Sequence, residues 1–170
     1  MNTQTLLSIV ADQREELLAN DYSELCPRPE ESQLDLKSNR AQVVIGVRRC
    51  GKSTLCEMFL KQKGIDFAYV NFDDDRMEDM KASDLDHLLE ALYMTYGEFK
   101  YLFLDEIQNI EGWPLFVNRL LRQKMHLFIT GSNSKLLSKE LSTHLTGRNN
   151  KVELYPFSYS EYCAMKNIDT

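Results

Sequence analysis

The sequence contains the stretch Gly46-Val47-Arg48-Arg49-Cys50-Gly51-Lys52-Ser53-Thr54, in which one glycine is followed by four free positions and then by Gly-Lys-Ser. This spacing is the pattern of a phosphate-binding loop. The apolar run Val43-Val44-Ile45 before it predicts a short buried strand, and Leu55, Met58 and Phe59 after it predict a helix. A glycine-rich turn that merely precedes a helix is the alternative, but the flanking strand and helix favour the phosphate-binding loop.

The residue types in this stretch suit a phosphorylated ligand. Gly46 and Gly51 allow the backbone to turn tightly and to bring consecutive N–H groups close to a phosphate. The helix that follows adds the positive end of its dipole. Lys52 is the expected point charge on the outer phosphates, and the hydroxyl of Ser53, supported by Thr54, is the expected ligand of a magnesium ion.

A second stretch, Tyr101-Leu102-Phe103-Leu104-Asp105-Glu106, places two acids directly after four apolar or aromatic residues. A buried strand that ends in two carboxylates is costly unless they meet a cation or reach solvent. We therefore expect Asp105 in the shell of the magnesium ion, and Glu106 as a general base that polarises a water toward the terminal phosphate. Acids that simply begin a surface loop are the alternative, which the phosphate-binding loop disfavours.

A polar turn, Gly131-Ser132-Asn133-Ser134, follows the predicted strand at 127–130. Polar residues at the carboxyl end of a strand lie where open parallel sheets bind ligands. Ser132 or Asn133 could therefore hold the attacking water. Capping of the next helix by Ser132 or Ser134 explains the same residues equally well.

Other candidate metal or redox groups give weaker signals. The turn Asp73-Asp74-Asp75 could bind a metal ion, but nothing nearby supplies the geometry of a dedicated site, so we interpret it as a solvated turn. The four cysteines, at positions 26, 50, 56 and 163, show no metal-type spacing and are expected to be reduced and mostly structural. Cys50 differs because it lies in the phosphate-binding loop, where its oxidation would crowd a nucleotide.

The chain of 170 residues has the composition of one soluble globular domain, with 43% hydrophobic and 27% charged residues. Its formal net charge of -6 argues against a strong non-specific binder of nucleic acid or of an anionic membrane, although it does not exclude a local basic site. No apolar run has the length of a transmembrane helix, and the N-terminus is acidic where a secretory signal would be basic. We therefore expect a cytoplasmic protein.

Five predicted strands alternate with helices along the chain, at residues 43–45, 67–72, 101–104, 127–130 and 151–155. This alternation predicts a three-layer α/β core in which a five-stranded, mainly parallel sheet is covered on both faces. The expected strand order, 5-1-4-3-2, places the turn at Ser132 between Lys52 and Asp105. We expect an N-terminal helical extension at 1–39, the core at 40–157 and the start of a further helix at 158–170.

These stretches together resemble a known family. The phosphate-binding loop is followed by Tyr-Leu-Phe-Leu-Asp-Glu-Ile-Gln-Asn, Ile-Thr-Gly-Ser-Asn-Ser-Lys-Leu-Leu, Leu-Thr-Gly-Arg and Leu-Tyr-Pro-Phe-Ser-Tyr-Ser-Glu-Tyr. In this order and at these intervals they resemble prokaryotic AAA-type ATPases, which carry an ATPase core followed by a C-terminal domain of unknown function. The resemblance covers residues 40–163. The departures, such as Val47 and Cys50, remove no required chemical group.

The resemblance implies ATP as the ligand and magnesium as the cofactor. It assigns the phosphates and magnesium to Lys52 and Ser53, the acidic pair to Asp105 and Glu106, the polar sensor to Ser132 or Asn133, and an arginine finger to Arg148. It also implies a C-terminal domain, which this chain does not include. We therefore expect the partner to be that absent domain or another protein.

Arg148 precedes the last predicted strand, which we expect at the edge of the sheet. A guanidinium there could reach the terminal phosphate of an adjacent subunit, which requires self-association. A surface arginine paired with an acid such as Glu153 is an equally good alternative.

Two functions agree with these expectations. The first is an ATPase that couples magnesium-dependent hydrolysis to a conformational change, and Glu106 favours it. The second is a nucleotide-gated switch that binds ATP with negligible turnover. A small-molecule kinase is disfavoured because no acceptor site is evident, and GTP is disfavoured because the sequence has no Asn-Lys-x-Asp motif.

Overall fold

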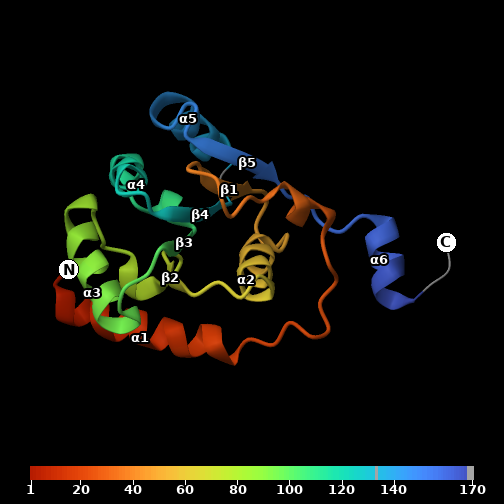
Figure 1. The fold of residues 1–170 in the computed structure, drawn as a ribbon, viewed down its shortest axis with the longest axis horizontal. Helices are drawn as coiled ribbons and strands as arrows, with labels where there is room; N and C mark the ends of the chain where they lie inside the picture. The colour runs from red at the N-terminus through yellow and green to blue at the C-terminus, as the bar shows by residue number, and fades with distance from the viewer. Residues whose placement is uncertain (133, 168–170) are drawn as a thin grey trace.

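The computed structural model describes residues 1–132 and 134–167 and contains a five-stranded sheet (Figure 1). The neighbouring strands all run parallel, and their order is β2-β3-β4-β1-β5. The predicted α/β fold and the order 5-1-4-3-2 are therefore confirmed. The strands are β1 (Ala41–Ile45), β2 (Phe67–Asn71), β3 (Tyr101–Asp105), β4 (His126–Gly131) and β5 (Asn149–Glu153).

Helices cover both faces of the sheet, because its central strands are apolar on both faces. One face packs against α2, where Phe59 contacts Phe128. The other face shares a buried cluster with α1, α3, α4 and α5, and α6 lies apart from the sheet in Figure 1. The helices are α1 (Thr3–Ala19), α2 (Lys52–Gln62), α3 (Leu85–Tyr96), α4 (Trp113–Arg122), α5 (Ser134–His144) and α6 (Tyr159–Lys166). Within the described ranges, no helix has both the length and the apolar character needed to span a membrane.

The last strand lies two residues before its predicted position at 151–155. β5 pairs with β1 from Asn149 beside Ala41 to Glu153 beside Ile45. Only Val152 of this edge strand is buried. The prediction was wrong at both ends because it followed apolar residues, whereas pairing with β1 determines where an edge strand begins.

The N-terminal helix α1 protects the opposite edge of the sheet. Gln13 is buried, its Oε1 accepts a hydrogen bond from the backbone N–H of Asn71 at 2.9 Å, and its Nε2 donates to the carbonyl of Asn71 at 3.0 Å. The side-chain amide of Gln13 thus pairs with backbone N–H and C=O groups at the edge of β2, where a further strand would otherwise pair. Because Asn71 ends β2, α1 also braces the carboxyl end of the sheet.

Candidate functional site

The loop between β1 and α2 depends on both of its glycines. Gly51 has φ 95°, in the left-handed region that favours glycine. A Cβ on Gly46 would lie 2.2 Å from the carbonyl oxygen of Leu154, so only glycine fits beside the chain that leaves β5. Gly51 is therefore needed for the turn, and Gly46 is needed for close packing.

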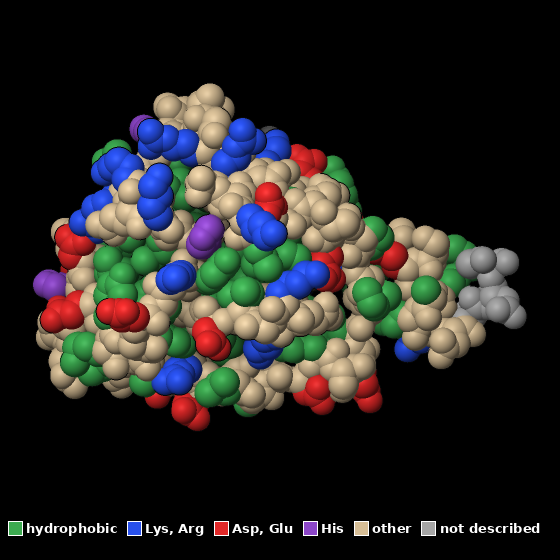
Figure 2. All heavy atoms as spheres, in the orientation of Figure 1, with side chains coloured by type: hydrophobic (Ala, Val, Ile, Leu, Met, Phe, Trp, Pro, Cys, Tyr) green, Lys and Arg blue, Asp and Glu red, His purple; other side chains and the backbone are tan. Residues whose placement is uncertain are grey.

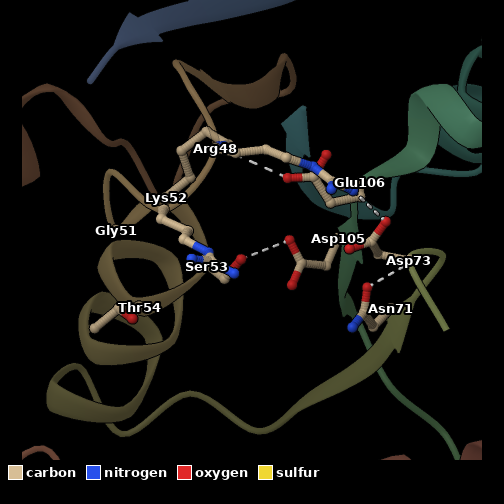
Figure 3. A pocket seen from close by; sticks show the side chains of 10 residues that line it. Arg48, Gly51, Lys52, Ser53, Thr54, Asn71, Asp73, Asp105 and Glu106 are labelled. Carbon is tan, nitrogen blue, oxygen red and sulfur yellow. Dashed lines mark hydrogen bonds and ion pairs between the residues drawn. The ribbon is translucent and has the colours of Figure 1, made fainter. Parts of the chain in front are cut away.

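The carboxyl end of the sheet opens into a pocket of about 420 Å³. Figure 3 shows Lys52 and Ser53, from the start of α2, facing Asp105 and Glu106 from the end of β3. Cationic and anionic groups meet here, as binding of phosphates together with a metal ion requires. The pocket is lined by Arg48, Arg49, Gly51, Lys52, Ser53, Thr54, Asn71, Asp73, Asp105 and Glu106.

Three residues of the predicted loop do not line this pocket. Gly46 packs on Leu154, and the side chain of Val47 is exposed while its carbonyl accepts a hydrogen bond from Lys52 Nζ at 2.9 Å. The thiol of Cys50 is buried and donates to the carbonyl of Leu154 at 3.5 Å. Oxidation of Cys50 would therefore disturb the contact with the chain after β5, and the expectation that it would crowd the nucleotide was wrong.

Asp105 is held at the end of β3 by hydroxyl groups. Its Oδ1 accepts hydrogen bonds from Ser53, at 2.8 Å, and from Thr130, and its Oδ2 accepts one from Tyr69 at 3.1 Å. The side chain is only 3% exposed. Burial raises the pKa of Asp105, although the three hydrogen bonds favour its charged form. The donors are neutral, so a bound cation would supply the charge that stabilises this buried carboxylate.

Glu106 follows Asp105 in a left-handed backbone conformation, with φ 56°. Such strain in a non-glycine residue is typical of functional sites. Its Oε2 accepts hydrogen bonds from the Ser132 backbone N–H at 3.0 Å, the Ser132 hydroxyl at 2.7 Å and the Gln108 amide at 2.5 Å. Its Oε1 lies 3.7 Å from Lys52 Nζ. Burial acts to raise the pKa of Glu106, but the hydrogen bonds and the charge of Lys52 lower it overall.

The structure brings Ser132 into the site, where it contacts Glu106, but not Arg148. Arg148 precedes β5 at the amino end of the sheet, opposite the pocket, and donates to Asn118 Oδ1 at 3.0 Å. Glu153, which was the suggested partner of Arg148, instead pairs with Lys151 at 3.6 Å. Asn133, the other candidate sensor, lies outside the described residues.

Sequence reasoning missed Tyr69, Thr130 and Gln108, which hold the two acids. Thr130 connects them, because its hydroxyl donates to Asp105 and accepts a hydrogen bond from the backbone N–H of Glu106 at 3.0 Å. Tyr69 and Thr130 lie within predicted strands, where they look like core residues. A usable signal for Thr130 was its place near the carboxyl end of the strand that the predicted order sets beside Asp105.

The acidic turn after β2 forms ion pairs with arginines. Arg48 Nη2 lies 2.8 Å from Asp73 Oδ1, and Arg76 Nη2 lies 2.8 Å from Asp74 Oδ2. Hydrogen bonds from Arg76 and Gln13 lower the pKa of Asp74 to about 2. Within residues 1–132 and 134–167 no group of three His, Cys, Asp or Glu side chains is arranged to hold a metal ion. Asp73 instead lies at the rim of the pocket, paired with the loop.

A buried arginine connects the phosphate-binding loop with the segment that follows β5. Arg28 donates to the carbonyl of Cys50 at 3.3 Å and to the carbonyl of Tyr155 at 2.6 Å. Its Nε lies 2.9 Å from Glu161 Oε1 of α6, and its guanidinium lies 4.5 Å from the ring centre of Phe157. The loop and α6 therefore share one packed cluster around Arg28.

The oxygen groups beside the loop fit a magnesium ion. Magnesium prefers hard oxygen ligands and is usually held by one or two protein groups together with the phosphates of its substrate. Ser53 Oγ and Asp105 Oδ1 lie 2.8 Å apart in the pocket that also contains Lys52. These two side chains would hold the ion next to phosphates bound by the loop.

Comparisons with known proteins agree with this site. Residues 38–163 match the family described as an AAA domain. A protein of Methanocaldococcus jannaschii is 41% identical over 138 residues, which cover 81% of this chain and 31% of that protein. A protein of Haemophilus influenzae is 39% identical over 137 residues, which cover 76% of this chain and 34% of that protein. Both relatives bear only the name uncharacterized protein.

The fold and the pocket define a nucleotide-binding P-loop protein of the ATPase type. The chain belongs to the AAA domain family. It spans about a third of the length of the curated relatives that it matches.

Proposed function

We propose that this chain is an ATPase core that couples magnesium-dependent ATP hydrolysis to a conformational change in a partner or in a C-terminal region. The observation that carries the proposal is the convergence of Lys52, Ser53, Asp105 and Glu106 on one pocket. Lys52 would bind the outer phosphates, Ser53 and Asp105 would hold magnesium, and Glu106 would act on the attacking water. When bound, magnesium neutralises charge on the phosphate oxygens.

In the proposed reaction, a water oxygen forms a bond to the terminal phosphorus while the bond from that phosphorus to ADP breaks. Glu106 accepts the proton of the water and later releases it to solvent, and ADP leaves with the electron pair. Thr130 fixes the positions of the two acids relative to each other, because its hydroxyl is hydrogen-bonded to Asp105 and to the backbone of Glu106.

The base of the nucleotide would occupy a smaller apolar cavity beside the loop, with a volume of about 130 Å³. Apolar and aromatic walls suit a flat heterocyclic ring. If so, Phe157→Ala weakens ATP binding but leaves the binding of inorganic tripolyphosphate unchanged, and an equal loss for both would argue against this assignment. The cavity is lined by Leu25, Cys26, Arg28, Glu31, Gly51, Thr54, Leu55, Met58 and Phe157.

The central test is phosphate release from ATP by the purified chain, with and without magnesium. We expect magnesium-dependent turnover, and we expect Glu106→Gln to lower kcat by about a hundredfold while ATP binding persists. Glu111→Gln is the matched control, because Glu111 is exposed and outside the pocket. Absence of magnesium-dependent release would contradict the proposal.

A nucleotide-gated switch with negligible turnover is a second candidate, and one observation favours it. The Oε2 atom of Glu106 already accepts hydrogen bonds from Ser132 and Gln108, and Lys52 Nζ bonds to the carbonyl of Val47. If the wild type and Glu106→Gln hydrolyse ATP equally slowly, while ATP changes the protease sensitivity of α6, the switch is the better description.

The division of the chain into three functional regions is also a proposal. The core at 40–157 would carry the chemistry, the extension at 1–39 would brace β2 through Gln13, and the segment from 158 would transmit the change. The relatives are about three times as long as the matched segment, which leaves room for a further region. Arg148, at the far end of the sheet from the pocket, would act on a second copy of the chain.

A further inference from the structure

Gln108 lies on the short turn Ile107–Asn109 directly after Glu106, and the ATPase mechanism proposed above gives it no role. Its Nε2 donates to Glu106 Oε2 at 2.5 Å and to Ser132 Oγ at 3.4 Å. Its Oε1 is buried without a hydrogen-bond partner among the described residues, beside Gly131. Because a buried unpaired acceptor is unfavourable, the contacts of Nε2 must determine how this amide is oriented.

The two carboxylate oxygens of Glu106 have different surroundings. Oε2 accepts hydrogen bonds from two groups of Ser132 and one of Gln108, which leaves it little capacity to accept a further proton. Oε1 faces Lys52 Nζ at 3.7 Å. Lys52 is the residue expected on the terminal phosphates, so Oε1 is the oxygen directed to the place where the attacking water would lie.

We propose that Gln108 is a positioning residue which, together with Ser132, holds Glu106 Oε2 and leaves Oε1 to accept the proton of the water. This inference rests on the proposed ATPase function. It also gives Ser132 a different role from the expected one, because its hydroxyl and backbone N–H orient Glu106 and do not hold the water.

The physical reason is the freedom of the glutamate side chain. Without Gln108, Glu106 can rotate and approach Lys52, where it would compete with the phosphates for the ammonium group. Misplacement of a reacting group by about 1 Å can cost on the order of a hundredfold in rate. We therefore expect loss of Gln108 to lower kcat by roughly ten- to a hundredfold, with a smaller effect on KM.

The first test observes the contact itself and does not need turnover. In ¹⁵N-labelled chain without nucleotide, the side-chain amide signals of Gln108 are identified by their loss in Gln108→Met. We expect Glu106→Ala to shift these signals strongly and the exposed control Glu111→Ala to leave them in place. Signals that do not respond to Glu106→Ala would overturn the inference, whether or not the chain hydrolyses ATP.

The second test separates this inference from the proposed function. Gln108→Met keeps the length of the side chain but removes its donor, so we expect lower kcat, nearly unchanged KM, and no further loss when it is combined with Glu106→Gln. Wild-type kcat in Gln108→Met, beside a defect in Glu106→Gln, would overturn the inference and leave the ATPase proposal intact. If Gln108→Met lowers kcat by the same factor in the wild type and in Glu106→Gln, its effect is a general structural one, and that result would also overturn the inference.

Discussion

The two ends of the sheet carry charged groups of different kinds. At the carboxyl end, Lys52 faces two neighbouring acids, Asp105 and Glu106, within one pocket. At the amino end, Arg148 precedes β5 and borders a surface hollow of about 460 Å³ along α3 and α4, which is also lined by Arg119, Arg122 and one acid, Asp86. Figure 2 shows Lys and Arg side chains gathered over α4 and α5, and α4 lines this hollow.

This difference follows from the parallel sheet. Parallel strands bring their carboxyl ends to one side, so polar groups far apart in sequence meet there around a single ligand. The amino end is separated from that pocket by the length of β5 (Asn149–Glu153), which is roughly 15 Å at the usual rise of a strand. The groups at the carboxyl end can therefore converge on one ligand within one molecule, whereas Arg148 lies too far from that pocket to reach a ligand bound there.

The largest expected effect is that of Lys52→Ala, which should abolish ATP binding at millimolar magnesium. Lys52 is the positioned charge for the outer phosphates, and it is only 4% exposed. Isothermal calorimetry is the measurement, with the exposed Lys63→Ala as control. Unchanged affinity in Lys52→Ala would remove the assignment of nucleotide chemistry to the carboxyl end.

The next effect tests the amino end. If Arg148 acts on a neighbour, Arg148→Ala should lower turnover by about a thousandfold, and wild-type specific activity should rise with protein concentration. Inactive Lys52→Ala chains should rescue Arg148→Ala chains on mixing, because each supplies what the other lacks. Arg122→Ala, in the same hollow, is the control for general loss of charge. Activity that is flat with concentration, without rescue, would leave Arg148 a structural residue.

Asp105→Asn should have a smaller effect, and it separates the role of Asp105 from that of Glu106. The asparagine can still accept hydrogen bonds from Ser53 and Thr130, but it carries no charge for magnesium. We expect the gain in ATP affinity upon addition of magnesium to fall on the order of tenfold. Binding is measured with and without magnesium, and Glu106→Gln should retain the magnesium effect. A similar loss in both variants would mean that the acids do not have separate roles.

The smallest effect concerns stability and pH. Burial raises the pKa of Glu57, on α2, to about 7 from an ordinary value of 4.5. The folded protein therefore holds this proton more tightly than the unfolded chain, so Glu57 lowers stability progressively as pH rises from 4.5 to about 7.

Glu57→Gln removes this cost. We expect it to stabilise the chain by about 2 kcal/mol above pH 7 and to have little effect below pH 4.5, as measured by urea denaturation. The exposed Glu16→Gln, on α1, is the control for the removal of a carboxylate from a helix. Stabilisation of equal size at low and high pH would contradict the raised pKa.

Much of this site could be predicted because its signals are local. The spacing of Gly46, Gly51 and Lys52 needs only a strand, a turn and a helix in succession. The acids at 105 and 106 follow directly on an apolar run. Their partners could not be predicted in the same way, because Tyr69 and Thr130 resemble core residues and Gln108 resembles any polar residue of a turn.

The sequence by itself determined the phosphate-binding loop and the acidic pair, because glycine spacing and apolar periodicity act over short distances. The expected strand order placed a further strand between the two that bear these motifs, and the structure confirms it. Only the tertiary structure decided which oxygen of Glu106 is held, that Cys50 faces Leu154, and that Arg28 joins the loop to α6. These outcomes depend on side-chain directions and on packing between segments as far apart as Arg28 and Glu161. The residue types allow several partners for each group, and the folded arrangement selects one of them.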